Sequence, residues 1–333
     1  MKIAYTLILT GIFVLATQTL KASEGEKVNK DSLKIINKKR KAFLKEFDYY
    51  VFIPKGSVGY FGEGESGKEK KKVENVNEFY MYNQELTNFN YLEFLYSLKN
   101  AGSPEYEKML PDTNVWISDL SYNEPYVQHY FRHPAYQNYP VVGVSYEQAI
   151  AYCEWITDIF NNGPFNIFKK VNFRLPTELE WMYAAQGGLE YAEYPWGGPY
   201  IKNAVGQPLA NCLLFGNEGI SRDTLYKKNE EGEYEEVYIY RAHRGGYYMG
   251  VAGSLNDAAD ITAPGHSYNP NGYGLYNMAG NVSEMVLEEG ITKGGSWKDP
   301  GYYLKNAVKQ SYTGRNSSSS TRGFRMIMEV IEY

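Results

Sequence analysis

The sequence predicts a mixed fold of helices and strands in which a large part of the chain is irregular. Aromatic residues make up 16% of the 333 residues, 33 of them Tyr, and Gly occurs 32 times. A buried tyrosine needs a hydrogen-bond partner for its hydroxyl, and glycine permits turns that other residues avoid. Regular patterns become sparse after Tyr194. Hydrophobic residues, at 43%, still indicate a packed globular core.

Two capping boxes mark helix starts, one at Ser145-x-x-Gln148 and one at Thr177-x-x-Glu180. In this motif the side chains at both positions bond the backbone N–H groups of the first helical turn. Apolar spacing predicts a further helix that begins at residue 87 or 88. The strand candidates are residues 51–54, 76–81, 140–144 and 322–328.

Three regions are predicted along the chain. Residues 1–22 are typical of a secretory signal peptide, because Lys2 precedes the apolar stretch 3–16. That stretch is short for a bilayer span, and an uncleaved N-terminal anchor is the alternative. Residues 23–46 are polar and rich in lysine, which favours an exposed linker that is partly helical. The folded domain is expected to cover residues 47–333.

Charge and cysteine content exclude some classes of function. The formal net charge of −5 and the pI near 5.6 argue against nucleic acid as a partner. The chain has two cysteines, Cys153 and Cys212, which could form one disulfide in an oxidising compartment. Cys153 lies on the apolar face of a predicted helix, so we expect it to be a buried free thiol.

Residues 271–284 form a stretch with three Gly and three Asn, which predicts a tightly coiled loop. The Asn277 amide, nearby carbonyl groups and the Glu284 carboxylate supply hard oxygen donors that suit Ca²⁺. The alternative is a turn-rich core loop in which Glu284 bonds backbone amides.

Residues 119–140 form a long aromatic stretch that also contains proline. Aromatic side chains dominate protein interfaces, so this stretch is a candidate contact surface for a partner. Packing inside the molecule is the alternative.

Five short motifs occur in the second half of the chain. They are Arg-Leu-Pro-Thr-Glu-x-Glu-Trp at 174–181, Tyr-Pro-Trp-Gly at 194–197, Asn-Gly-Tyr-Gly-Leu-Tyr-Asn-Met-x-Gly-Asn-x-x-Glu at 271–284, Gly-Gly-Ser-Trp at 294–297 and Arg-Gly-Phe-Arg at 322–325. In this order and spacing they resemble the formylglycine-generating enzyme (sulfatase-modifying factor) family, over about residues 47–333. The resemblance implies an irregular α+β fold, related to C-type lectins, with little regular secondary structure.

A narrower resemblance rests on the aromatic segments at residues 122–126, 130–136 and 139–145. They are similar to the gliding-motility and type IX secretion lipoproteins of Bacteroidetes, the GldK, PorK and GldJ group. This implies a non-catalytic protein-binding scaffold in the periplasm, at the inner face of the outer membrane. Its partners would be outer-membrane and periplasmic proteins of a secretion or motility complex, and its own membrane association only indirect. No cysteine near the predicted cleavage site could carry a lipid, which departs from that group.

The enzymes of the resembled family use two cysteines in the spacing Cys-x₄-Cys-x₃-Arg. Their thiolates bind Cu(I), for which sulfur is a suitable soft ligand. The matching positions here are Asn306, Ser311 and Arg315, so neither copper nor oxidation of a substrate cysteine is expected. The alternative is an enzyme of altered chemistry, or a peptide or glycan binder, whose groove is lined by Ser311, Arg315 and Asn316.

The resemblance also implies two structural calcium sites, which would cross-link loops with few regular hydrogen bonds. The ligands of the first would be Asn277, Gly280, Val282 and Glu284, and those of the second Asn211, Cys212, Asp257 and Ala259.

Overall fold

A computed structural model gives the fold, and it describes residues 30–63, 69–117, 123–164, 167–204, 207–213, 220–228, 234–242 and 261–333. The predicted signal peptide lies outside the described residues. Within them, no helix is both long and apolar enough to cross a membrane.

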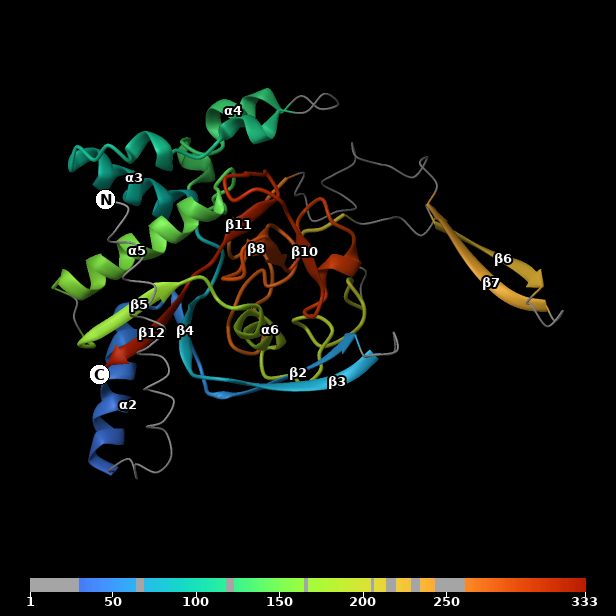
Figure 1. Ribbon diagram of the computed structural model, residues 1–333, viewed down its shortest axis with the longest axis horizontal. Coiled ribbons are helices and arrows are strands. Elements are labelled where there is room, and N and C mark those ends of the chain that lie inside the picture. Colours follow the sequence, from blue (N-terminus) through green and yellow to red (C-terminus); the bar gives the residue numbers. More distant parts are fainter. Residues whose placement is uncertain are drawn as a thin grey trace, which may run out of the picture.

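The described part of the chain contains two four-stranded β-sheets (Figure 1). The first is antiparallel, in the order β1 (Tyr50–Ile53), β4 (Phe79–Tyr82), β12 (Ile327–Glu332) and β5 (Lys170–Arg174). The second has the order β10 (Lys309–Ser311), β9 (Ile291–Lys293), β8 (Ser283–Met285) and β11 (Arg322–Phe324), with β8 and β11 parallel. The last strand of the chain, β12, therefore lies between β4 and β5 and joins them into one sheet.

Two β-hairpins form separate two-stranded sheets. One pairs β2 (Gly56–Glu63) with β3 (Glu69–Val76), and the other pairs β6 (Ile220–Lys228) with β7 (Tyr234–Ala242). Figure 1 shows the second hairpin projecting away from the body of the molecule.

The α-helices lie around the two sheets (Figure 1). They are α2 (Lys30–Glu46), α3 (Asn88–Asn100), α4 (Glu124–His129), α5 (Tyr146–Asn162) and α6 (Glu178–Gln186). Short 3-10 helices occur at η1 (Tyr106–Met109), η2 (Thr113–Trp116), η3 (Pro134–Tyr136) and η7 (Gly301–Leu304). Both predicted capping boxes are present, at the first turns of α5 and α6. The mixed fold with long irregular segments is therefore confirmed.

The main core lies between the first sheet and helices α3 and α5. Aromatic rings from these elements contact one another, as Tyr91 of α3 does with Tyr152 of α5, whose ring centroids are 6.0 Å apart. Cys153 of α5 is a buried free thiol, as expected, so it does not pair with Cys212. Part of the high tyrosine content thus fills this interior.

Within the described part of the aromatic stretch 119–140, residues 123–140, the rings of Tyr130 and Phe131 are buried, while many of the other side chains are exposed. The Tyr130 ring contacts Trp116 at a centroid distance of 4.6 Å, and its hydroxyl donates to the Pro140 carbonyl at 2.7 Å. Phe131 is buried in the main core. The expectation that these rings form a contact surface is therefore wrong for Tyr130 and Phe131, because burial in an aromatic cluster stabilises them more than exposure does.

Helix α2 differs from the exposed linker expected for residues 23–46. Its Phe43 has an exposed fraction of 1% and contacts the rings of Tyr80 and Phe168 at 4.9 and 5.4 Å. Arg40 lies 3.6 Å over the Phe52 ring and pairs with Glu78 at 3.1 Å. The packed part of the chain thus begins within α2, before residue 47.

Replacement of Phe43 by alanine should therefore destabilise the whole domain. A buried phenylalanine truncated to alanine costs about 3–5 kcal/mol in free energy of unfolding. The matched control is Leu33→Ala on the same helix, because Leu33 is 46% exposed and its loss should change stability by less than about 0.5 kcal/mol. Urea unfolding of both variants measures the difference; equal, small effects would mean that α2 does not belong to the folded domain.

Candidate functional site

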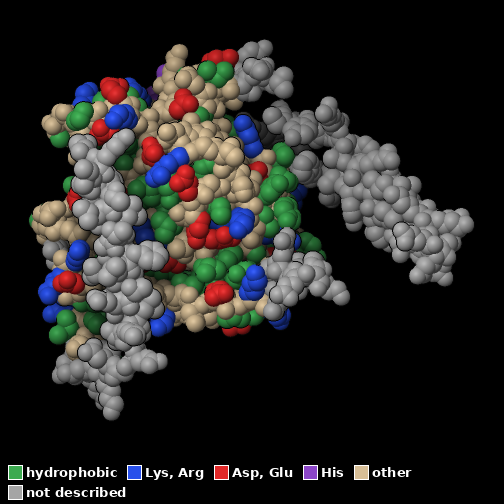
Figure 2. All heavy atoms as spheres, viewed as in Figure 1, with side chains coloured by type: hydrophobic (Ala, Val, Ile, Leu, Met, Phe, Trp, Pro, Cys, Tyr) green, Lys and Arg blue, Asp and Glu red, His purple; other side chains and the backbone are tan. Residues whose placement is uncertain are grey.

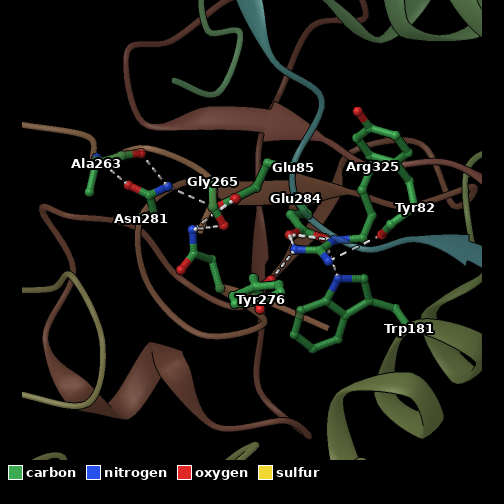
Figure 3. A network of polar contacts seen from close by, with 10 residues as sticks. Tyr82, Glu85, Trp181, Ala263, Gly265, Tyr276, Asn281, Glu284 and Arg325 are labelled. Carbon is green, nitrogen blue, oxygen red and sulfur yellow. Dashed lines mark hydrogen bonds and ion pairs between the residues drawn. The ribbon is translucent and has the colours of Figure 1, made fainter. Parts of the chain in front are cut away.

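A buried ion pair joins β8 of the second sheet to the residue that follows the edge strand β11 (Figure 3). Glu284 of β8 and Arg325, which follows β11, have exposed fractions of 1% and 0%. The Nε of Arg325 donates to both carboxylate oxygens of Glu284, at 2.9 and 2.8 Å. An arginine fork matches a carboxylate in this way, so the two charges neutralise each other inside the core.

The ion pair also connects elements that are distant in the sequence. The Trp181 Nε1 of α6 donates to Glu284 Oε2 at 2.7 Å. The second terminal nitrogen of Arg325 donates to the Tyr276 carbonyl at 2.8 Å, within the coiled stretch 271–284. Every member of this network has a hydrogen-bond partner, which is the condition under which buried charges are tolerated.

A second carboxylate, Glu85, lies beside this pair and is completely buried. Asn277 Nδ2 and Asn281 Nδ2 donate to its two oxygens at 3.0 and 2.9 Å. Burial raises the pKa of Glu85 to about 8, against the opposing effect of the nearby Arg325 guanidinium. Both asparagines have positive φ, 51° and 65°, so the coil turns sharply at these two residues and aims both amides at Glu85.

Asn277 fits the expected first calcium site. Its Oδ1 is buried and has no hydrogen-bond partner, and a buried amide oxygen of this kind is a suitable ligand for a hard cation. Glu284 is different, because Arg325 and Trp181 already donate to its oxygens. Its partners are these side chains and not the backbone amides of the alternative interpretation.

The second expected calcium set is only partly within the described residues. Asn211 is buried and its Nδ2 donates to the Ile261 carbonyl at 2.7 Å, while Cys212 is buried next to it. Asp257 and Ala259 lie outside the described residues. In the part of the chain that the structure covers, no three His, Cys, Asp or Glu side chains cluster as metal ligands, so a cation there would depend on amide and carbonyl oxygens.

The two positions that match the family's cysteines lie in different environments. Asn306 has an exposed fraction of 2%, and its Nδ2 donates to the Ala192 carbonyl at 2.9 Å while its backbone N–H donates to the Glu193 carbonyl at 2.7 Å. Ser311 is exposed at the end of β10, opposite Ile291 of β9. Asn306 therefore anchors the chain to a neighbouring loop, and Ser311 ends an edge strand.

A surface hollow of about 480 Å³ lies beside the loop that follows β10. Its lining residues are Glu105, Lys108, Met109, Leu110, Asp112, Gly143, Ser145, Glu147, Gln148, Asn316 and Ser318. Arg315 is half-exposed and pairs with Glu147 of this lining at 3.2 Å and with Glu289 at 3.6 Å. Of the three groove residues expected from the sequence, Asn316 lines the hollow, while Ser311 and Arg315 do not.

A buried lysine in β9 was not predicted from the sequence. Lys293 of β9 pairs with Glu178 at 3.4 Å, and Lys309 of β10 pairs with the other oxygen of the same carboxylate at 3.2 Å. Burial lowers the pKa of Lys293 to about 8, although Glu178 opposes the shift. Lys293 directly precedes Gly294 and Gly295, which both have positive φ, and this local pattern does not indicate that the lysine is buried.

Comparisons with known proteins decide the family. The family model described as "Sulfatase-modifying factor enzyme 1-like domain" matches residues 37–330. The chain belongs to this family. Its start at residue 37 agrees with the docking of α2 onto the core.

Individual relatives include proteins named as formylglycine-generating enzymes and proteins named as inactive. A formylglycine-generating enzyme of Thermomonospora curvata is 34% identical over 151 residues, which cover 45% of this chain and 34% of that protein. The "Inactive C-alpha-formylglycine-generating enzyme 2" of Bos taurus is 29% identical over 170 residues, which cover 48% and 39%. The match spans 34–44% of the length of the first four curated relatives.

Among solved structures, Treponema denticola variable protein 1 superposes with a TM-score of 0.49 and 17% sequence identity. The superposition covers 84% of this chain and 94% of that one.

Loss of the Glu284 charge should be costly, because Arg325 would remain buried without a counter-ion. We expect Glu284→Gln to lower the free energy of unfolding by about 3–5 kcal/mol. Glu105→Gln is the matched control, since Glu105 pairs with Lys108 at the surface and such pairs contribute less than about 1 kcal/mol. Equal losses in guanidinium unfolding of the two variants would contradict the structural role of the buried pair.

Proposed function

We propose that this chain is a non-catalytic member of its family that acts as a protein-binding scaffold in the periplasm. Its place would be the inner face of the outer membrane, and its partners the outer-membrane and periplasmic proteins of a type IX secretion or gliding-motility complex. The signal-like residues 1–22 and the narrower resemblance of residues 122–145 support this place and these partners.

The observation that carries the non-catalytic part is the environment of Asn306. In the resembled enzymes a thiolate at this position binds copper, whereas here a carboxamide bonds the Ala192 carbonyl and anchors a loop. Neither cysteine of the chain can substitute, because Cys153 and Cys212 are both buried. Burial also raises the pKa of the Cys153 thiol well above its usual range, which keeps it protonated.

A relative named as inactive supports the same proposal, because it lies within the same family. The buried network of Glu85, Glu284 and Arg325 is complete and includes neither Asn306 nor Ser311. Residues that stabilise the fold are thus retained where the soft metal ligands are replaced.

The described part of the aromatic stretch limits what a partner could touch. Tyr130 and Phe131 are buried, while Arg132, His133 and Gln137 are exposed. A protein partner at this place would therefore meet polar and charged side chains, held in position by the aromatic cluster below them.

The hollow beside Arg315 favours a second candidate, a binder of peptides. Carboxylates, amides and hydroxyls line it, and its volume of about 480 Å³ lies within the usual range for small-molecule sites. A peptide with basic side chains would have to compete with Lys108 for Glu105 and with Arg315 for Glu147.

Capture of partners from a cell envelope tests the scaffold proposal. The tagged chain should recover outer-membrane proteins of a secretion or motility complex. A bait with Arg132→Glu and Gln137→Glu should recover less of these envelope proteins if the exposed side of residues 123–140 is the contact. The control bait carries Glu93→Gln at an exposed position of α3. Recovery of no envelope protein by the unaltered bait would sink the scaffold proposal and favour the peptide binder.

We also propose that Ca²⁺ braces the fold through Asn277 and nearby carbonyl oxygens. An ion present at a hundred times its dissociation constant stabilises the folded state by about 2.7 kcal/mol, so chelation should lower the Tm by several degrees. Asn277→Gly should remove this response, because glycine keeps the positive φ and loses only the amide. Asn316→Gly on the exposed loop is the control, and an unchanged Tm of the unaltered protein on chelation would count against calcium.

A further inference from the structure

We propose that α2 binds the surface of an anionic phospholipid membrane through a stripe of four lysines. The lysine stripe consists of Lys34, Lys38, Lys41 and Lys45, all of which are exposed. Their spacing of four, three and four residues places them along one face of the helix, because an α-helix turns once every 3.6 residues.

The lysine stripe points away from the body of the molecule. Phe43, which is buried in the core, lies two residues from both Lys41 and Lys45. Two residues correspond to a rotation of about 200° around the helix axis, so these lysines lie almost opposite the docked face. Arg40 is on the inner side, where it pairs with Glu78 and holds the helix to the sheet.

The charge of the last three lysines of the stripe is not neutralised within the part of the chain that the structure describes. No carboxylate there forms an ion pair with Lys38, Lys41 or Lys45. Helix α2 carries seven basic and two acidic side chains, although the whole chain has a formal net charge of −5. On the face drawn in Figure 2 the two signs are interspersed over the body, which differs from the single sign of the stripe.

Apolar side chains flank the stripe at the free end of the helix. Leu33 and Ile35 have exposed fractions of 46% and 57%. Figure 1 shows the first turns of α2 extending past the first sheet, so nothing in that sheet covers them. Exposed apolar residues beside lysines are typical of helices that lie at a membrane surface, with the apolar groups among the lipid chains and the ammonium groups at the phosphates.

This combination favours a lipid surface over an acidic protein. Each lysine near an anionic bilayer contributes through long-range attraction and needs no matched partner geometry, which suits four flexible side chains. Leu33 and Ile35 lie about 200° apart around the helix axis, on either side of Lys34, so they form no common apolar face and the charge of the lysines carries the inference. The inference deepens the envelope role proposed above and depends on it only for the location, and it makes the membrane association direct where the sequence suggested an indirect one.

Vesicle co-sedimentation tests this inference with protein that begins at Ser23, so that the apolar residues 3–16 contribute nothing. Binding should be strong for vesicles in which about a third of the lipid is phosphatidylglycerol and weak for phosphatidylcholine alone, and added salt should reduce it. The triple variant K38Q, K41Q, K45Q should bind about a hundredfold more weakly. The control variant K55Q, K72Q, K170Q removes the same charge at exposed positions elsewhere and should bind as the unaltered protein does.

Three results would overturn the inference. These are equal binding to both kinds of vesicle, equal losses in the two triple variants, and binding to soluble polyglutamate without binding to vesicles. The last would identify an acidic protein as the partner of α2. Circular dichroism should show that both variants keep the helix content of the unaltered protein. Because the vesicles contain no protein, a failure here leaves the capture of envelope partners as a separate test.

Discussion

The buried pair of Glu284 and Arg325 is the interaction on which the rest of the structure depends. Each charge would be very unfavourable alone in the core, and together they satisfy each other and the donors and acceptors around them. The pair fixes α6, β8, the end of β11 and the coil 271–284 in one arrangement. A fold with short strands and long loops has few ladder hydrogen bonds, so such polar networks supply the specificity that regular sheets obtain from backbone pairing.

If the family's chemistry is absent, as proposed above, the same constraint explains how the fold persists without it. Asn306 and Ser311 lie outside the network, in segments held by Ala192, Glu193 and β9. Substitution at those two positions leaves Glu85, Glu284 and Arg325 untouched. Stability and copper chemistry therefore depend on different residues, and one can be lost while the other is kept.

Local signals in the sequence predicted local structure well. The capping boxes at Ser145 and Thr177 gave the starts of α5 and α6, because a cap depends on residues three positions apart. The coil 271–284 was likewise predicted from its Gly and Asn content. The five motifs predicted the family, which the match over residues 37–330 confirms.

Contacts between residues that are distant in the sequence were harder to predict. The pairing of Glu284 with Arg325 joins residues 41 positions apart, and that of Glu85 with Asn281 joins residues 196 apart, so no periodicity indicates either. The docking of Phe43 was missed because lysines dominate its helix, and the burial of Tyr130 because a tyrosine fits both an interface and a core. The first calcium set was suggested by the oxygen donors of residues 271–284 and completed by the resemblance, while the second rested on the resemblance alone. The environment of Asn277 gives the first set structural support.

The account's central claim is that Asn306 and Ser311 leave this domain without the copper–thiolate chemistry of the enzymes it resembles. The most direct measurement incubates the purified protein with Cu(I), oxygen and a peptide that contains a sulfatase-type cysteine, and follows the peptide by mass spectrometry. The account predicts no oxygen-dependent conversion of that cysteine. Enzyme-dependent turnover to the aldehyde would contradict it.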